Sequence, residues 1–338
     1  MDDTVCAENW PEVFTKLRKF LDKRFEISYG EKLTWYLSVH YEKSKDERFI
    51  VATQTAYIDR MVQKYSIVHP VKTPMEETFK IKIEDIPIRV DVKLKAEAQE
   101  KLGVLIHIAG WSRPDILFAT IKLAAHAANP SKKIMDGINR VFRYLLGTKH
   151  LGIRFTNDEK HMFGLKRHEL GTYVDASYGD DLISRKSTMG YFCVLNGGLV
   201  SWRSKHTPVV CTSTTDAEYI AACYAAMETM HLRQLLKALG FEQSKPTPLF
   251  EDNEACIALA GDSVFRERTK HIDIRFHYLR ERVRDRDIQM IKIASAQQLA
   301  NSLTKAEGAI LFQLHRQLYM FDRRAVTGQA TNEEEPAS

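Results

Sequence analysis

The order of strand-like and helix-like segments after residue 168 limits the folds open to this chain. Three segments rich in β-branched and aromatic residues come first, and they span 170–177, 188–198 and 199–204. A helix-like segment then runs from Thr215 to Gly240. A fourth strand, two helices, a fifth strand and a helix continuing towards Met320 complete the order. This order predicts an α/β fold with one mixed five-stranded sheet flanked by helices.

The preceding residues are predicted to be mainly helical. The first unit is expected to hold a helix at 13–26, strands at 34–43 and 47–54, and a helix at 55–66. A charged connector at 76–96 follows, and the order Ser-Arg-Pro-Asp at 112–115 is typical of a helix start. We therefore expect an N-terminal unit at 1–75, a connection at 76–160, the α/β domain at 168–322 and a disordered tail at 323–338.

The composition is typical of an intracellular globular protein. Apolar residues make up 44% of the 338 residues, and no stretch approaches the roughly 18 consecutive apolar residues of a membrane span. The N-terminus has no basic-then-apolar signal pattern, and the five cysteines show no CxxC pair and no zinc-ligand spacing. We expect reduced thiols, a cytoplasmic or nuclear location and no secretion. The net charge of +5 is too small to indicate a partner.

Three acids are predicted to meet at one edge of the sheet. Asp175 ends the first strand, Asp252 ends the fourth, and Glu218 lies in the first turn of the helix between them. Sites in α/β sheets gather at the carboxyl ends of strands and at the helix starts that follow. Three converging carboxylates repel one another unless cations bind between them, and such oxygen ligands suit Mg²⁺ or Mn²⁺. Two such ions form an arrangement that cleaves phosphodiesters.

Each acid also has a purely structural interpretation. Thr215, with Glu218 three places on, forms a capping box, in which side chains satisfy the first amides of a helix. Asp175 alone is compatible with a turn, and Asp252 followed by Asn253 is compatible with a cap of the next helix. The residues alone leave both interpretations open.

Long blocks of the sequence resemble the Pol polyproteins of copia-type LTR retrotransposons. Over residues 170–320, five blocks of this sequence resemble the family's ribonuclease H domain: YVDASYGDDLISRKSTMGY, TSTTDAEYIAA, EDNEACIALA, RTKHIDIRFHYLRE and QLANSLTK. The block SRPDILFATIKLAAHAANPSKK resembles the connection that precedes that domain in the family. The block YIDRMVQKYSIVHPVKTPM resembles the end of the family's reverse transcriptase. The resemblance implies a C-terminal fragment of such a polyprotein: a truncated palm and thumb remnant, a helical connection and a ribonuclease H-like domain.

By this resemblance, Asp175, Glu218 and Asp252 match three metal-binding carboxylates of the ribonuclease H active site. The fourth family carboxylate falls in the block at 300–305, where Asn301 replaces the acid. An amide oxygen can ligate a hard cation without bringing negative charge, so we expect weaker metal binding and weakened activity. The implied reaction is cleavage of the RNA strand of an RNA–DNA hybrid with two Mg²⁺ or Mn²⁺ ions and no small-molecule cofactor.

Substrate contacts are expected from a basic segment at 263–286, which holds eight Lys plus Arg residues against four acids. Within this segment we expect Lys270, His271 and Arg275 to contact substrate, and Arg185 to join them from the turn before the second strand. The alternative for the basic segment is a solvated helix with i,i+4 ion pairs. The alternative for Arg185 is a role in shaping its hairpin.

The first residues resemble the strand that carries the polymerase's catalytic acids in the same family. Asp2 and Asp3 are therefore expected to be a remnant of the polymerase site. The chain is not expected to be a competent reverse transcriptase. Residues 1–75 are expected to be its less stable part. The alternative to an active ribonuclease H is a catalytically degenerate relic that at most binds nucleic acid. An integrase-type enzyme is disfavoured, because its Glu comes last among the three acids whereas Glu218 comes second.

Overall fold

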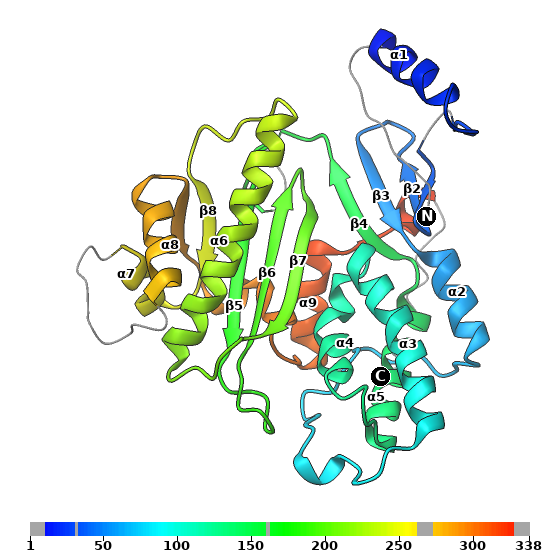
Figure 1. Ribbon diagram of the computed structural model, residues 1–338, viewed down its shortest axis with the longest axis vertical. Coiled ribbons are helices and arrows are strands. Elements are labelled where there is room, and N and C mark those ends of the chain that lie inside the picture. Colours follow the sequence, from blue (N-terminus) through cyan, green and yellow to red (C-terminus); the bar gives the residue numbers. More distant parts are fainter. Residues whose placement is uncertain (1–10, 31–32, 160–162, 262–272, 328–338) are drawn as a thin grey trace, which may run out of the picture.

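The computed structural model describes residues 11–30, 33–159, 163–261 and 273–327 (Figure 1). Its central sheet has five strands in the order β7-β6-β5-β8-β9. These strands are β5 (Gly171–Ser177), β6 (Thr188–Leu195), β7 (Gly198–His206), β8 (Thr247–Glu251) and β9 (Ile288–Lys292). β5, β6 and β7 pair antiparallel, whereas β5, β8 and β9 pair parallel. The predicted mixed five-stranded sheet is confirmed.

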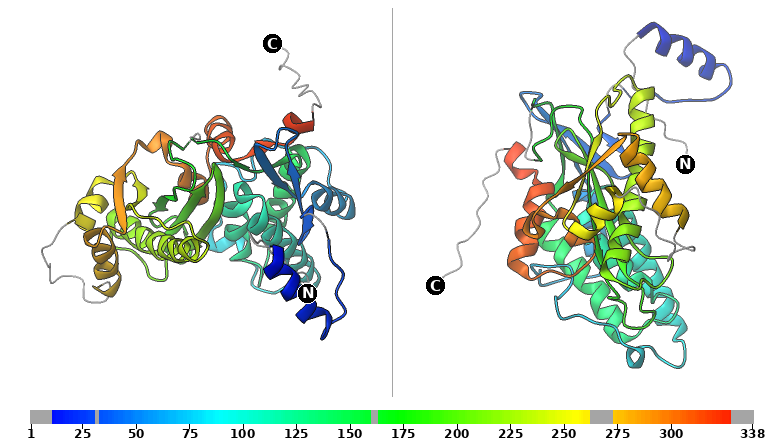
Figure 2. Two further views of the ribbon diagram at one scale, coloured as in Figure 1. Left: turned by 90° about the horizontal axis from the view of Figure 1, so that it is seen from above. Right: turned by 90° about the vertical axis from the view of Figure 1, so that its left-hand side faces the viewer.

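Helices cover both faces of this sheet. Alternate side chains of a strand point to opposite faces, and buried side chains on each face pack against helices. The covering helices are α6 (Thr214–Ala238), α7 (Glu254–Gly261), α8 (Asp273–Arg284) and α9 (Ala309–Tyr319). Val174 of β5 packs in one core with Ala221 and Ala225 of α6. Its neighbour Tyr173 packs in the other core, which includes Phe312 of α9. α6 and α9 therefore lie on opposite sides of the sheet (Figure 2).

A group of helices from the preceding residues packs beside the central sheet and shares the core that contains Tyr173. These elements are α2 (Thr55–Lys64), α3 (Val92–Trp111), α4 (Leu117–Ala124) and α5 (Lys132–Thr148), with the 3-10 turns η1 (Ile83–Asp85) and η2 (Pro114–Ile116). The expected connector at 76–96 is too long, because α3 already begins at Val92. Its cap is Asp91, whose carboxylate accepts the N–H groups of Lys93 at 2.9 Å and Leu94 at 3.1 Å.

A second sheet brings together residues from the two ends of the chain. Its order is β1-β2-β3-β4-β10, with every pair antiparallel. The strands are β1 (Trp35–Tyr36), β2 (Val39–Lys43), β3 (Phe49–Thr53), β4 (Leu151–Thr156) and β10 (Phe321–Asp322). The predicted strand at 47–54 corresponds to β3, whereas the predicted strand at 34–43 is divided into β1 and β2, which pair with each other. The sequence analysis missed β4, which lies between β3 and β10.

The C-terminal helix is shorter than the sequence suggested. Two 3-10 turns, η3 (Ser295–Gln297) and η4 (Leu299–Leu303), precede α9, which begins only after Gly308. The expected continuous helix towards Met320 is therefore wrong. A short helix, α10 (Arg324–Thr327), stands where the disordered tail was expected to begin, and residues 328–338 lie outside the described residues.

The first described helix, α1 (Pro11–Asp22), has no buried residue. It stands apart from the rest of the molecule in both Figure 1 and Figure 2. The strands and helix that follow it differ, because Val39, Val51 and Ile58 are fully buried. Within the expected unit at 1–75, the strands and α2 therefore contribute to a buried core, whereas α1 contributes no buried residue.

A buried ion pair joins the preceding helices to α9. Arg113 and Asp115 are both fully enclosed, with an Nη2 to Oδ2 distance of 2.7 Å. The hydroxyl of Tyr144 in α5 donates to Asp115 at 2.5 Å, and Arg316 of α9 donates to the Tyr144 oxygen at 3.2 Å. Arg113 also donates to the backbone oxygen of Thr148 at 2.9 Å. These bonds fix α9 against η2 and α5.

The described helices include none that is both long enough and apolar enough to cross a membrane. The cysteines among the described residues are buried and are not joined in disulfides: Cys193, Cys211, Cys223 and Cys256.

Candidate metal centre

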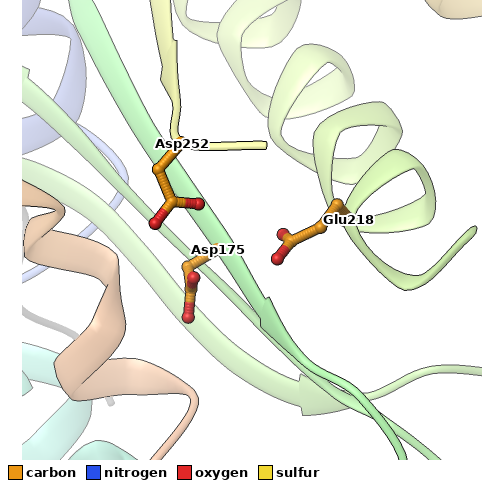
Figure 3. A group of neighbouring side chains, drawn as sticks. All are labelled: Asp175, Glu218 and Asp252. Carbon is orange, nitrogen blue, oxygen red and sulfur yellow. The ribbon is translucent and has the colours of Figure 1, made fainter. Parts of the chain in front are cut away.

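Asp175, Glu218 and Asp252 point towards one another at one edge of the central sheet (Figure 3). Each offers a carboxylate oxygen, and the three oxygens all lie within 4.8 Å of one another. β5 and β8 are parallel neighbours, so the end of β5 that carries Asp175 lies beside the end of β8 that precedes Asp252. Asp175 is 3% exposed and Glu218 4% exposed, and Asp252 is half-buried. The structure thus brings together the three acids selected from the sequence.

The capping box predicted at Thr215 is wrong. Ser213 caps α6, because its hydroxyl oxygen accepts the backbone N–H of Asp216 at 3.1 Å. This cap starts the helix before Thr215 and leaves Glu218 free of any capping role. Glu218 instead accepts a hydrogen bond from the backbone of Ala176 in β5. The helix start therefore delivers the Glu218 carboxylate to the sheet edge.

Asp252 is not the cap of the following helix either. Asn253 takes that position, since its side-chain oxygen accepts the backbone N–H of Cys256 at 2.9 Å. The Asp252 carboxylate accepts instead from the hydroxyl of Ser295 at 2.6 Å, and its backbone oxygen accepts from Lys292. The end of β9 and the turn after it therefore hold Asp252 towards the other two acids.

Burial and the charges of neighbouring acids raise the pKa of two of these groups, Glu218 and Asp175. Burial raises the pKa of Glu218 to about 11, with further increases from the charges of Glu251, Asp175 and Asp252. Burial also raises the pKa of Asp175, against the attraction of Lys305 and the hydrogen bond from Thr304. The Oε2 atom of Glu218 is buried without a hydrogen-bond partner among the described residues. A divalent cation would stabilise the ionised carboxylates and give this oxygen a partner, so the donor set fits a hard metal ion.

Glu251 is a further buried acid that the sequence analysis missed. It is fully buried, and its Oε1 atom accepts the backbone N–H groups of Asp252 at 3.0 Å and Asn253 at 2.9 Å. Its Oε2 atom has no partner among the described residues. Burial raises the pKa of Glu251 to about 8, and the charges of Asp175 and Asp252 contribute to the increase. The available signal was strand alternation, because Leu249 and Glu251 lie on the same side of β8.

Asn301 lies in η4, where the family acid was expected. Its Nδ2 atom donates to the backbone oxygen of Ser295 at 3.0 Å, which leaves its Oδ1 atom buried and without a partner among the described residues. Three residues later, the hydroxyl of Thr304 donates to Asp175. η4 thus connects the neutral amide of Asn301 to Asp252 through Ser295, whose hydroxyl donates to that carboxylate.

The residues expected to contact substrate are only partly described. Arg185 is exposed in the loop after β5, with a left-handed φ of 57° and its N–H bonded to the backbone oxygen of Asp181 at 2.9 Å. This turn geometry agrees with a role in shaping the hairpin. Several sequence predictions lie outside the described residues: Asp2, Asp3, Lys270, His271 and the side chain of Arg275.

The described end of the basic segment carries internal ion pairs. Arg282 lies 2.7 Å from Asp287, and Arg284 lies 3.0 Å from Asp285. Arg280 donates to the backbone oxygen of Leu259 at 3.0 Å. The two ion pairs have i,i+5 and i,i+1 spacing rather than the i,i+4 spacing of the solvated-helix alternative, and Arg280 makes a contact to another helix.

Comparison with known proteins gives relatives over nearly the whole chain. The chain is 30% identical over 323 residues to the retrovirus-related Pol polyprotein from transposon TNT 1-94 of Nicotiana tabacum, covering 94% of this chain and 24% of the polyprotein. It is 28% identical over 315 residues to that from transposon RE1 of Arabidopsis thaliana, covering 93% and 21%. The chain therefore spans about a quarter of the length of these relatives.

A shorter relative and several solved structures also match. The secreted RxLR effector protein 161 of Plasmopara viticola is 36% identical over 131 residues, which is 39% of this chain and 87% of the effector. LC11-RNase H1, isolated from compost by a metagenomic approach, matches with a TM-score of 0.30 and 14% identity over 40% of this chain and 93% of that chain. RNase H1 of Halobacterium salinarum matches with a TM-score of 0.27 and 15% identity, covering 40% and 94%. No protein-family model matches the sequence.

Proposed function

This chain is homologous to the retrovirus-related Pol polyproteins of transposons, and from that premise we propose that residues 168–322 form a metal-dependent ribonuclease H. The proposed reaction is endonucleolytic cleavage of the RNA strand of an RNA–DNA hybrid. Residues 1–75 and 76–160 then correspond to the end of the reverse transcriptase and the connection of such a polyprotein.

One observation carries this proposal: three carboxylate oxygens within 4.8 Å of one another, from Asp175, Glu218 and Asp252. An exposed acidic cluster alone would not point to chemistry. Here two of the three acids are almost fully buried, at 3% and 4% exposure, and one Glu218 oxygen has no partner among the described residues. Burial of unpaired carboxylates is costly, and it is offset where they hold a cation.

The three acids would hold two Mg²⁺ or Mn²⁺ ions. When bound, such ions lower the pKa of an attacking water and stabilise the leaving oxygen of a phosphodiester. Asp175 of β5 would hold these ions together with Glu218 from α6 and Asp252 at the end of β8, whose carboxylates lie around the same point (Figure 3). Asn301 would add a neutral oxygen at the same site.

The proposed substrate contacts come from basic residues on the chain after α7 and in the first hairpin. We assign Lys270, His271, Arg275 and Arg185 to the backbone of the hybrid. Such contacts release counterions, so binding should weaken as salt rises. Contacts to 2′-hydroxyl groups would distinguish the RNA strand from DNA.

A second candidate function is a catalytically degenerate protein that binds nucleic acid without cleaving it. The neutral side chain of Asn301 beside the acids favours this alternative, because it lowers the negative charge available to hold metal.

A cleavage assay separates the two candidates. The full chain is incubated with an RNA–DNA hybrid labelled on the RNA strand, with Mg²⁺, with Mn²⁺ or with EDTA. We expect metal-dependent cuts within the RNA strand, their loss in Glu218→Gln, and their retention in Asp216→Asn, a control acid two residues away on α6. Binding of the hybrid without cleavage under every metal condition would support the degenerate alternative.

A further inference from the structure

η4 packs unusually close to the strand pair that carries Asp175. Gly190 of β6 lies directly opposite Asp175 of β5. A Cβ atom at Gly190 would stand 2.6 Å from the Cβ of Leu303 and 3.1 Å from the Cγ2 of Thr304. A glycine at position 190 therefore lets Leu303, at the end of η4, and Thr304, directly after it, approach this part of the sheet closely.

The close approach lets Thr304 contact the site. Its hydroxyl donates to the Oδ2 atom of Asp175 and lies 3.1 Å from the backbone oxygen of Asn301. Thr304 is fully buried, and the Ser204 hydroxyl of β7 donates to the backbone oxygen of Leu303 at 2.7 Å. Contacts on both sides therefore hold the Thr304 hydroxyl in place.

We propose that Thr304 is a positioning residue for Asp175. Its hydroxyl donates to one carboxylate oxygen of Asp175 and so fixes the orientation of that carboxylate beside Glu218 and Asp252. The β-branched side chain of threonine has few rotamers, so the donor is held ready before metal binds. This inference rests on the proposed metal site and adds a residue outside the ligand set. Groups that orient metal ligands typically change metal affinity by about 10–100-fold when they are lost.

The test compares Mn²⁺ binding, measured by electron paramagnetic resonance, in the full chain and two variants. Thr304→Val keeps the branched shape and removes the hydroxyl, whereas Thr304→Ser keeps the hydroxyl. We expect the Mn²⁺ dissociation constant to rise about tenfold or more in Thr304→Val and to stay within about twofold of wild type in Thr304→Ser. Circular dichroism confirms that each variant is folded.

Thr120→Val is the matched control. Thr120 is also fully buried, and its hydroxyl donates to the backbone oxygen of Ile116 at 2.8 Å in α4. A loss of stability without a loss of Mn²⁺ affinity is expected there. If Thr120→Val raised the Mn²⁺ dissociation constant as much as Thr304→Val, the loss of any buried hydroxyl would explain the effect. The positioning role of Thr304 would then be rejected.

The remaining outcomes separate this inference from the proposed function. Unchanged Mn²⁺ affinity in Thr304→Val, or a tenfold loss in folded Thr304→Ser, overturns the positioning role while the metal site stands. If wild type binds no Mn²⁺ and Asp175→Asn behaves identically, both the metal site and the role of Thr304 are wrong. If Thr304→Val does not fold, the Mn²⁺ affinity of Thr304→Ser decides. Affinity close to that of wild type supports the positioning role, and a tenfold loss contradicts it.

Discussion

Asn301 and Asp252 are joined through a single residue, Ser295. The Asn301 amide donates to the Ser295 backbone oxygen at 3.0 Å, and the Ser295 hydroxyl donates to the Asp252 carboxylate at 2.6 Å. The neutral residue is thus part of the hydrogen-bond network that orients a proposed metal ligand. Its Oδ1 atom is buried and has no hydrogen-bond partner among the described residues.

Restoring an acid at position 301 should strengthen metal binding. Asn301→Asp adds negative charge to the site, so the Mg²⁺ concentration for half-maximal hybrid cleavage should fall by roughly tenfold and the rate should rise. A Mg²⁺ titration of cleavage by both forms measures this. Identical titration curves would mean that residue 301 does not reach the metal, and no cleavage by either form would favour the degenerate alternative.

Removing the charge of Asp175 should separate cleavage from binding. Asp175→Asn should abolish hydrolysis and leave hybrid affinity largely unchanged, because affinity rests mainly on basic and polar groups. Cleavage of labelled hybrid and a filter-binding measurement report the two properties. Undiminished cleavage in this variant would remove the site assignment.

The metal-free protein should lose stability as pH rises. A carboxyl group with a pKa raised on folding binds its proton more tightly in the folded state, so ionisation favours unfolding. The pKa of Glu251 rises from 4.5 to about 8 on folding, so its contribution is lost progressively between those values. Glu218, raised to about 11, extends the loss to higher pH. Urea unfolding in EDTA between pH 5 and pH 9, values chosen to bracket these pKa shifts, measures the trend.

Glu251→Gln tests the cause of that trend. The variant keeps an oxygen that can accept the N–H groups of Asp252 and Asn253 and removes the buried charge, so its stability should fall less steeply with pH. Saturating Mg²⁺ should flatten the wild-type curve as well, because cations favour the ionised acids. A slope equal to that of wild type in EDTA would show that Glu251 does not titrate in this range.

Breaking the enclosed ion pair should destabilise the whole fold. Asp115→Asn leaves Arg113 charged, buried and without a counterion, which typically costs about 3–5 kcal/mol. Urea unfolding followed by circular dichroism measures the change in free energy. Lys149→Ala, which removes the exposed pair with Asp59, serves as the control and should change stability by less than about 1 kcal/mol.

Proteolysis should distinguish α1 from the strands that follow it. α1 has no buried residue, so brief protease treatment should cut between Asp22 and Trp35 and leave β2, β3 and α2 attached to the rest. Mass spectrometry of the fragments identifies the cuts. Cleavage throughout residues 35–75 at the same rate would instead support the earlier expectation that the whole unit at 1–75 is unstable.

The strands of the central sheet could be predicted from the sequence because the patterns that indicate them are local. Strand alternation in 170–177, glycine-rich turns and the helix end at Gly240 each depend on neighbouring residues. The three acids followed from the rule that sites in α/β sheets gather at the carboxyl ends of strands and at the starts of the helices that follow. The resemblance to a known family then linked these acids to a reaction.

Other features depend on contacts that a local pattern does not contain. β4 is a short strand directly after a helix, and its partners lie about a hundred residues before it and more than a hundred after it. The cap of α6 lay within a run of four hydroxyl residues at 212–215, any of which resembles a cap. The role of Thr304 needed the packing of η4 against Gly190, which is a tertiary contact.

The position of β4 also determines when the second sheet can form during synthesis. β3 pairs with one edge of β4 and β10 with the other, so the sheet is completed only by residues 321–322. During translation, β2, β3 and β4 can pair early, but one edge of β4 stays open until the entire central sheet has left the ribosome. That open edge could pair with another nascent chain, because unpaired strand edges promote association. Because β10 later covers only Leu151 and Gly152 of that edge, chains made on one polysome could join one another through β4 from the moment it emerges.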